Sequence, residues 1–215
     1  MRYYTLTTST DINKIGFYPQ TDLSEESEFF SPFSTFLPKI SIIPDKIPKY
    51  KIIINDSAIP TDIIERIGVS YGLVLNETLK TILESKNLPD NKFFPIEVMW
   101  QNKLLDYYWF HSYDNIFQYI DMSLSQFTVR QYNDVSDFYF NSEAFFYEKK
   151  MESMNDFTKT FMLKKIYFLD KFPKYDLFTF ENLTLISEKL LNIFQENNIN
   201  GYEAKLYEIL EFDNV

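Results

Sequence analysis

Histidine and cysteine, two residue types that often carry acid–base or nucleophilic chemistry, are scarce in this sequence. The 215 residues include one histidine, His111, and no cysteine. A serine–histidine–acid device would have to use His111, but no strained Gly-x-Ser-x-Gly elbow accompanies it. His111 ends an aromatic run beside a turn at residues 112–115, where a histidine is commonly a hydrogen-bonded residue at the rim of a fold. We therefore expect neither a catalytic histidine nor a thiolate-based or histidine-based metal site.

A second candidate for chemistry is the run Asp121-Met122-Ser123-Leu124-Ser125. Its Asp-x-Ser-x-Ser spacing after an apolar stretch is typical of a magnesium site, because carboxylate and hydroxyl oxygens suit a hard divalent cation. Aspartate and serine are also the commonest turn residues, and no glycine-containing partner loop follows. We expect Asp121 and Ser125 to close a turn and to bind no metal.

Composition restricts the remaining classes of function. Four glycines cannot build a Gly-rich phosphate loop, which argues against nucleotide-binding enzymes. No pair among the 31 acidic residues stands out as a glycosidase couple, and a formal net charge of −10 makes a poor nucleic-acid binder. The first residues have no apolar signal region and no run reaches membrane-spanning length. We therefore expect a protein with no cofactor, no small-molecule substrate, no nucleic acid and no membrane contact.

Two stretches share one order of residues, namely an apolar strand, a capping residue, a glutamate and an amphipathic helix. In residues 72–88 the expected N-cap is Asn76, and in residues 183–199 it is Ser187. Each of these side chains can accept from the unpaired N–H groups of a first helical turn. Each stretch then continues into an aromatic, extended segment. The matched order predicts a strand–helix–strand internal duplication.

The fold class expected from these patterns is α+β, with a mixed, mostly antiparallel sheet and flanking helices. Aromatic residues form 19% of the chain, which favours strands and broad packed faces over a helix bundle. Helical spacing and caps predict helices at 61–67, 76–87, 142–154 and 187–197. Alternation and turn residues predict an edge strand at 3–7, a hairpin of 104–110 with 116–120, and strands at 51–54, 127–132, 138–140, 165–169 and 176–180.

The chain is predicted to contain an N-terminal wrapping segment, residues 1–59, laid across an α+β body, residues 60–215, as one compact unit. The segment is rich in proline and aromatic residues, and a disordered arm would not hold so many aromatics. Its acidic and aromatic side chains also offer a recognition surface, with the rings as anchors and the carboxylates at the rim. The residues expected to bind a partner are Asp22, Glu25, Glu26, Glu28, Phe29 and Phe30.

Six motifs follow one another between about Pro60 and the C-terminus. They are Leu73 to Lys80, the paired aromatic strands, Ile120 to Phe127, Ser142 to Phe145, Tyr175 to Phe178, and Leu185 to Leu190 running on to Asn200-Gly201-Tyr202. In this order they resemble a family of bacterial proteins proposed to be immunity proteins of polymorphic toxin systems. The resemblance implies a cytoplasmic, non-catalytic protein that binds and neutralises a cognate protein toxin. It also implies structural positions for Asn76, Asp121, Ser125, Ser187 and Gly201.

Three functions from different classes remain open. The first is an immunity protein that occludes the active face of a toxin, and a basic toxin such as a nuclease would suit the acidic chain. The second is a carboxylate-based hydrolase, which a pocket converging on several acids with raised pKa values would favour. The third is a structural subunit of a phage or secretion assembly, which a large apolar patch and oligomer symmetry would favour.

Overall fold

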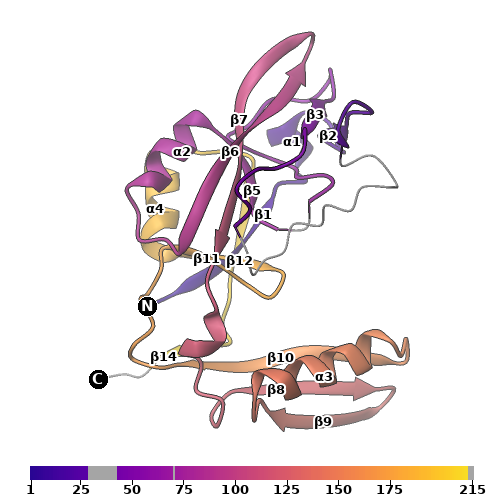
Figure 1. Ribbon diagram of the computed structural model, residues 1–215, viewed down its shortest axis with the longest axis vertical. Helices are drawn as coiled ribbons and strands as arrows, with labels where there is room; N and C mark the ends of the chain where they lie inside the picture. Colours follow the sequence, from indigo (N-terminus) through magenta and orange to yellow (C-terminus); the bar gives the residue numbers. More distant parts are fainter. Residues whose placement is uncertain (29–42, 70, 213–215) are drawn as a thin grey trace. The chain divides into compact units, whose positions relative to one another are not determined.

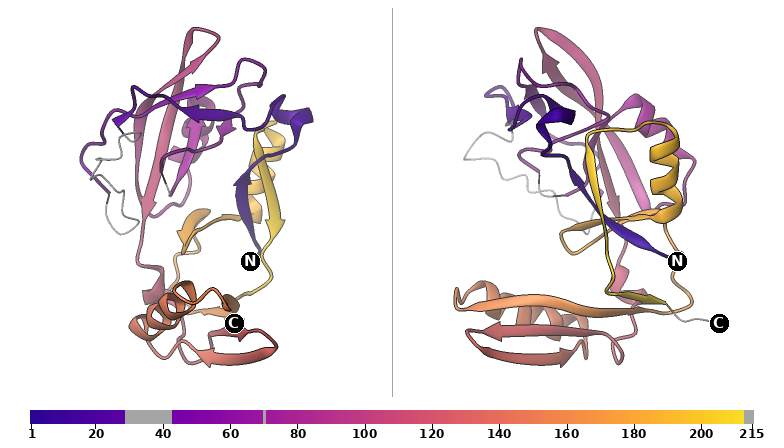
Figure 2. Two further views of the ribbon diagram at one scale, coloured as in Figure 1. Left: turned by 90° about the vertical axis from the view of Figure 1, so that its right-hand side faces the viewer. Right: turned by 180° about the vertical axis from the view of Figure 1, so that it is seen from behind.

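The computed structural model describes residues 1–28, 43–69 and 71–212, and it divides into two compact units (Figures 1 and 2). The larger unit comprises residues 2–114 and 174–206. The smaller unit contains residues 115–173 and the C-terminal segment from residue 207. The predicted division after residue 59 does not coincide with this one, because strands from the first 59 residues lie within both sheets of the larger unit.

Two sheets form the framework of the larger unit (Figure 1). The six-stranded sheet has the order β2-β3-β6-β7-β5-β4, with bounds Thr21–Leu23, Lys51–Ile54, Asp90–Trp100, Lys103–Tyr113, Leu73–Asn76 and Ile63–Ile64. The four-stranded sheet has the order β11-β12-β1-β13, with bounds Leu177–Phe180, Leu183–Ser187, Tyr3–Thr8 and Tyr202–Leu206. Neighbouring strands pair antiparallel, whereas β3 and β6 are parallel. The predicted α+β class is confirmed.

Helices α2 (Glu77–Glu84) and α4 (Glu188–Glu196) bury their apolar stripes in one shared core, and a short helix, α1 (Ile12–Ile15), follows β1. Leu79 and Leu83 from α2 are fully buried there, as are Leu190 and Phe194 from α4. Apolar side chains from strands of both sheets complete this core. A second core that includes Trp109 lies within the same unit. The shared core therefore depends on how the two helices are held together.

The units at α2 and α4 have the same connectivity, as the repeated sequence pattern predicted. Strands β5 and β6 precede and follow α2 in the chain and lie on either side of β7, and strands β12 and β13 precede and follow α4 and lie on either side of β1. Each middle strand is antiparallel to both neighbours, so the two strands joined by each helix run parallel. The second unit takes its middle strand from the start of the chain, which places residues 3–8 inside a sheet and not at the predicted edge. A superposition of the two units stays a prediction.

Both predicted helix caps are confirmed. The Asn76 Oδ1 atom accepts from the N–H group of Leu79 at 3.1 Å, and the Ser187 Oγ atom accepts from the N–H group of Leu190 at 3.1 Å. A glutamate follows each cap and lies at the positive end of the helix dipole. The caps are therefore equivalent positions of the two units.

Asp62 holds the cap of α2 from outside the helix. Its carboxylate accepts from the side-chain amide of Asn76 at 2.8 Å, and its backbone carbonyl accepts from the Asn76 N–H group at 3.0 Å. The other carboxylate oxygen accepts from the N–H group of Asn200 at 2.8 Å, in the loop after α4. Tyr107 pairs with Asn76 across the sheet and donates its hydroxyl to the carbonyl of Thr61 at 2.5 Å.

Asp176 makes the matching set of bonds for α4. Its carboxylate accepts from the Ser187 hydroxyl at 3.0 Å, and its carbonyl accepts from the Ser187 N–H group at 2.8 Å. The other oxygen accepts from the N–H group of Asn87 at 3.1 Å, in the loop after α2. Tyr3 pairs with Ser187 and donates its hydroxyl to the carbonyl of Tyr175 at 2.8 Å. Each aspartate thus joins the start of one helix to the end of the other, so α2 and α4 run antiparallel.

The smaller unit is a sheet with one long helix on it. The strand order is β14-β10-β8-β9, with bounds Leu210–Phe212, Lys159–Phe168, Gln126–Gln131 and Asp134–Tyr139, and the helix is α3 (Glu143–Met154). Phe146 on α3 is fully buried, and its ring centroid lies 5.7 Å from that of Phe127 and 5.2 Å from that of Phe161. Aromatic contacts of this kind fill the space between α3 and the sheet.

The helix predicted at residues 61–67 is wrong. Ile63 and Ile64 instead form β4, which is antiparallel to β5, and both side chains are buried. The Thr61 hydroxyl donates to the carbonyl of Ile63 at 2.7 Å, and the Ile63 N–H group donates to the carbonyl of Asn200 at 3.2 Å. The Ile63 backbone is therefore satisfied by the Thr61 side chain, by β5 and by the loop at Asn200, and so short a helical pattern is too weak to compete.

The strand predicted at residues 116–120 is also wrong, because Ile116–Tyr119 forms a 3₁₀ helix. Strand β7 pairs with β6, which precedes it, through a turn at Gln101 and Asn102 with φ values of 47° and 62°. Two residues with positive φ match the twist of a two-residue hairpin. Residues 112–115 therefore do not form the turn of a hairpin between 104–110 and 116–120.

The paired aspartate bonds predict a large effect of Asp176→Ala. Asp176 is 4% exposed and both carboxylate oxygens accept hydrogen bonds, so the variant should lose about 3 kcal/mol of unfolding free energy. Asp62→Ala should lose less, because Asp62 is partly exposed. Urea unfolding measures both, with the exposed Asp106→Ala as control. A loss of less than about 0.5 kcal/mol in Asp176→Ala would contradict the assigned role.

Candidate functional site

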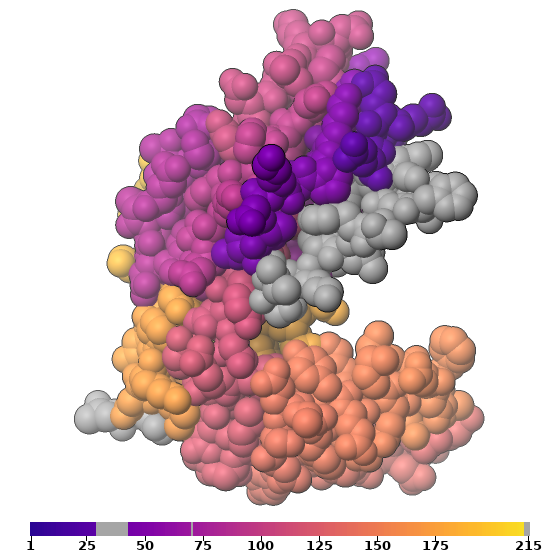
Figure 3. All heavy atoms as spheres, in the orientation of Figure 1, coloured from indigo at the N-terminus to yellow at the C-terminus, as the bar shows by residue number. Residues whose placement is uncertain are grey.

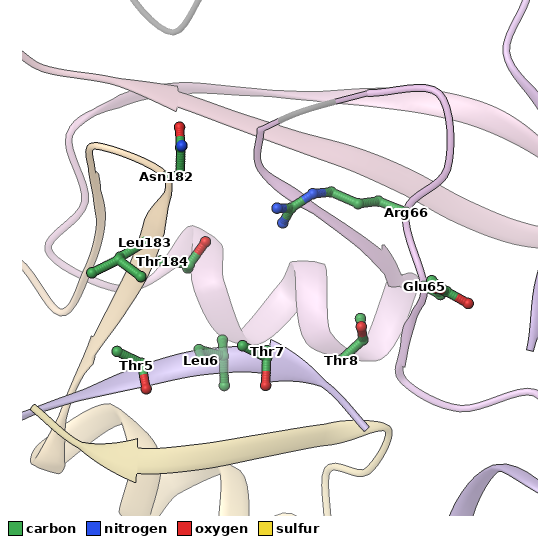
Figure 4. Close-up of a pocket in the computed structure, with 9 residues that line it drawn as sticks. All are labelled: Thr5, Leu6, Thr7, Thr8, Glu65, Arg66, Asn182, Leu183 and Thr184. Atoms are coloured by element: carbon green, nitrogen blue, oxygen red, sulfur yellow. The ribbon is translucent and has the colours of Figure 1, made fainter. Parts of the chain in front are cut away.

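A hollow of about 250 Å³ in the larger unit gathers polar side chains (Figure 4). It lies between β1, the loop after β4 and the turn that leads into β12. Its lining consists of Thr5, Leu6, Thr7, Thr8, Glu65, Arg66, Asn182, Leu183 and Thr184. Sites for drug-sized ligands occupy about 300–1,000 Å³, so this hollow suits a single amino-acid side chain or a molecule of that size.

Arg66 supplies the positive charge of the hollow. Its Nη1 atom donates to the carbonyl of Gly72 at 2.8 Å, and Figure 4 shows the guanidinium extending toward Asn182 and Thr184. Burial lowers the pKa of Arg66, and the Tyr50 phenol acts in the opposite direction. No carboxylate in the described part of the chain forms an ion pair with Arg66. A guanidinium has five N–H donors in a planar fork, so donors remain for an anion.

The neighbouring acid, Glu65, does not neutralise Arg66. The two side chains point in different directions in Figure 4. Burial is the main cause that raises the pKa of the Glu65 carboxyl, and Asp22 raises it further. The Glu65 Oε2 atom is buried without a hydrogen-bond partner among the described residues. The lining thus includes a single carboxyl group, whereas the hydrolase alternative called for several acids in one pocket.

Two of the predicted partner-binding acids make bonds within the fold. The Glu26 carboxylate lies 2.8 Å from Lys51 Nζ and 3.2 Å from Lys49 Nζ. The hydrogen bond from Lys51, followed by that from Lys49, lowers the pKa of Glu26. Glu28 accepts from the backbone N–H group of Lys49 at 2.8 Å. Glu26 and Glu28 therefore hold the segment before β3 in place, and reversing their charges would disturb it.

The other predicted partner-binding residues are placed differently. Asp22 lies in β2 with an exposed side chain, and Glu25 is exposed in the turn after it. Phe29 and Phe30 lie outside the described residues. Asp22 and Glu25 are therefore exposed to solvent. Neither forms an ion pair with a described lysine, whereas Glu26 does.

Asp121 and Ser125 close a turn, as the sequence predicted. The Asp121 Oδ1 atom accepts from the Ser123 hydroxyl at 2.6 Å, the Ser123 N–H group at 2.9 Å and the Leu124 N–H group at 3.2 Å. Ser125 donates its N–H group to the Asp121 carbonyl at 3.0 Å, and its hydroxyl accepts from the N–H group of Tyr167 at 2.9 Å. The described residues contain no group of three or more His, Asp or Glu side chains arranged to hold a metal ion.

His111 and Gly201 have structural environments. His111 is buried in β7, not at a rim, and its ring stacks on Trp109 with centroids 5.1 Å apart. Gly201 has a φ of 83°, and a Cβ atom added there would lie 2.1 Å from the carbonyl oxygen of Ile63. The positive φ and the close approach to Ile63 both require glycine at this position.

An exposed apolar surface lies on α3 in the smaller unit. Tyr147, Met151 and Met154 follow one another at i, i+4 and i+7, so they share one face of the helix. Their exposed fractions are 40%, 51% and 62%, and Phe157, just beyond the helix, is 102% exposed. We call these four residues the α3 surface. Helix α3 is on the side of the smaller unit that Figure 3 shows.

A hydrogen-bonded turn presents Phe157. The Asp156 carboxylate accepts from the Thr158 hydroxyl at 2.6 Å and from the Thr158 N–H group at 3.0 Å. Lys159 donates its N–H group to the Asp156 carbonyl at 2.8 Å, and its ammonium lies 3.4 Å from the same carboxylate. These bonds fix the backbone on both sides of Phe157, whose ring is exposed.

Sequence reasoning missed both the Arg66 hollow and the α3 surface. A lone arginine has no spacing signal, and the fold brings Asn182 and Thr184 to it from more than a hundred residues away. The α3 surface did have a signal, since Tyr147, Met151 and Met154 repeat at helical spacing. This spacing predicts a helix but does not indicate which of its two apolar faces the core covers.

No helix among the described residues is long and apolar enough to cross a membrane. No family model matches the sequence, and a search of curated proteins finds no match.

The Asp121 turn predicts a depressed titration midpoint. The Ser123 hydroxyl, followed by the N–H groups of Ser123 and Leu124, holds the pKa of the Asp121 carboxyl below its usual value. Because the folded pKa is lower, the stabilisation is complete above the unfolded value of about 3.9 and is lost as the pH falls through the folded value. Ser123→Ala should raise the midpoint in an NMR titration of the carboxyl carbon, whereas Ser136→Ala, at an exposed position in β9, should not. An unchanged midpoint in Ser123→Ala would be evidence against this account.

Proposed function

We propose that this protein is a non-catalytic binding protein of the immunity type, which neutralises a protein toxin by covering its active face. The order of motifs between Pro60 and the C-terminus supports the class, because it resembles that of proposed immunity proteins. The α3 surface carries the proposal, because it gathers four exposed apolar side chains in one place. Exposed apolar side chains that gather in one place mark interaction sites.

The chemistry of the α3 surface suits a protein partner. Methionine side chains are flexible and polarisable, so Met151 and Met154 can adapt to an irregular apolar surface. Tyr147 and Phe157 supply aromatic area of the kind enriched at binding hot spots. The turn around Asp156 fixes the backbone of Phe157 before binding, which reduces the entropy lost on association.

Charge supports a basic toxin as the partner. The net charge of −10 attracts a basic protein at long range and raises the association rate. Close to the α3 surface both signs occur, with exposed Glu143 and Glu148 on the helix and Lys150 and Lys159 near its end. Net charge therefore contributes to the rate of encounter, and apolar contacts contribute to the lifetime of the complex.

A titration of the toxin encoded beside this protein tests the proposal. Wild-type protein should abolish the toxin's activity at one molecule per toxin molecule, because a covering mechanism is stoichiometric. Met154→Ser/Phe157→Ala should raise the dissociation constant by about thirtyfold, as expected for hot-spot residues. The matched control is Met162→Ser on β10, which is also exposed and faces the side of the sheet away from α3.

Two outcomes would reject this proposal. Equal affinities for wild type and Met154→Ser/Phe157→Ala would remove the α3 surface from the interface. Inhibition at far less than one molecule per toxin molecule would indicate an enzyme. Circular dichroism and thermal unfolding of each variant confirm that the fold is retained.

The acidic segment gives a separate prediction about association rate. Glu25→Lys reverses an exposed charge without breaking the lysine contacts of Glu26, so folding should be nearly unchanged. The variant should associate more slowly with the same toxin, and its association rate should depend less on salt. Stopped-flow binding at two ionic strengths measures this. The same rates for the variant and wild type would place Glu25 outside the electrostatic approach path.

A further inference from the structure

We propose that the Arg66 hollow is a binding site for a carboxylate carried by a group the size of one amino-acid side chain. The hollow lies in the larger unit, and the α3 surface lies in the smaller one. This inference does not depend on the proposed function, because it rests on Arg66 and its surroundings alone.

The Arg66 guanidinium is held in place, but no described carboxylate neutralises its charge. The bond from Nη1 to the carbonyl of Gly72 fixes one side of the fork. Gly72 is itself fixed, because its φ is +77° and a Cβ atom there would lie 2.0 Å from the carbonyl oxygen of Phe110. In a chain with 31 acidic residues, Arg66 forms no ion pair with any described carboxylate. An oriented cation with unused donors is arranged for an external anion.

The wall of the hollow opposite Arg66 carries neutral hydrogen-bond donors. Figure 4 shows Asn182 and Thr184 on the side toward which the guanidinium extends. An amide N–H₂ group and a hydroxyl are both able to donate to a carboxylate oxygen. Leu6 and Leu183 are also among the lining residues, but Leu6 belongs to the core and Leu183 points away from the guanidinium in Figure 4. The wall therefore suits the carboxylate end of a short carboxylic acid.

The charge and shape of the hollow favour a carboxylate over a phosphate as its ligand. Phosphate groups carry close to two charges and are commonly bound by several cations or by a nest of backbone N–H groups. Arg66 is the one cation in the lining, and Glu65 is present on the other side of it. A planar guanidinium matches a planar, singly charged carboxylate in a bidentate pair. The volume of the hollow, about 250 Å³, limits the ligand to a group the size of one amino-acid side chain.

The test uses the full chain and three small carboxylates observed by NMR. N-acetylglutamate N-methylamide represents an acidic side chain of a polypeptide, N-acetylglycine represents a C-terminal carboxylate, and acetate represents a free acid. At least one should bind with saturation, one per protein, with a dissociation constant on the order of 1 mM. The probe that binds most tightly identifies the source of the carboxylate. N-acetylglutamine N-methylamide should bind at least tenfold more weakly than its glutamate counterpart.

Variants then locate the binding. Arg66→Gln should abolish saturable binding, and Arg66→Lys should weaken it at least threefold, because an ammonium lacks the planar fork. Arg130→Gln, at the end of β8 in the smaller unit, removes one positive charge elsewhere and should bind as wild type does. Asn182→Asp gives an independent check, because position 182 is exposed and a carboxylate placed there competes with the probe for Arg66. This variant should bind the probe at least threefold more weakly than wild type.

The inference is overturned by any of three results. These are the absence of saturable binding by all three carboxylates, equal binding by the glutamine analogue, and unchanged binding in Arg66→Gln. If Arg66→Gln does not fold, unchanged affinity in Asn182→Asp with a wild-type spectrum elsewhere would overturn it equally.

Discussion

The larger unit depends on the hydrogen bonds of Asp62 and Asp176. An N-cap alone satisfies groups within one helix, whereas each aspartate also binds a loop far away in the chain, as Asp62 binds Asn200 across 138 residues. Hydrogen bonds to charged acceptors contribute about 1.5–3 kcal/mol each, so these long-range bonds are among the strongest directional interactions in the unit. They hold α2 and α4 antiparallel against one core. They also fix the start of β4, and Arg66 lies two residues beyond that strand.

The two sets of bonds match in detail and not only in strand order. In each unit a tyrosine opposite the cap donates to the carbonyl that precedes the aspartate, and burial, followed by the charge of that aspartate, raises the pKa of the tyrosine. Helix capping is common, but this four-part arrangement is not a requirement of capping. The arrangement is what the predicted duplication requires, with the middle strand of the second unit supplied by the start of the chain, and the duplication itself stays a prediction. The placement of β1 inside a sheet follows from this connectivity.

The sequence was informative wherever structure is decided locally. The caps at Asn76 and Ser187, the turn at Asp121 and the strand at 51–54 follow from a few neighbouring residues, and all are confirmed. The sequence failed where a distant partner decides the outcome. Ile63 pairs with β5 and with the loop at Asn200, and nothing near Ile63 in the chain indicates either contact. Helix α3 is an intermediate case, because its spacing showed two apolar faces but only packing against Phe127 and Phe161 shows which face is covered.

Arg66 and Glu65 are neighbouring opposite charges that do not neutralise each other. The two opposite charges are adjacent in sequence and both are partly removed from water, which disfavours the charged form of each. Mutual neutralisation would relieve both costs. The two side chains point in different directions, so they do not form this ion pair (Figure 4). Each charge therefore stays without an ion-pair partner among the described residues. Local conflict of this kind is most often found at sites that bind something from outside the fold, which is the reason to assign the hollow a ligand.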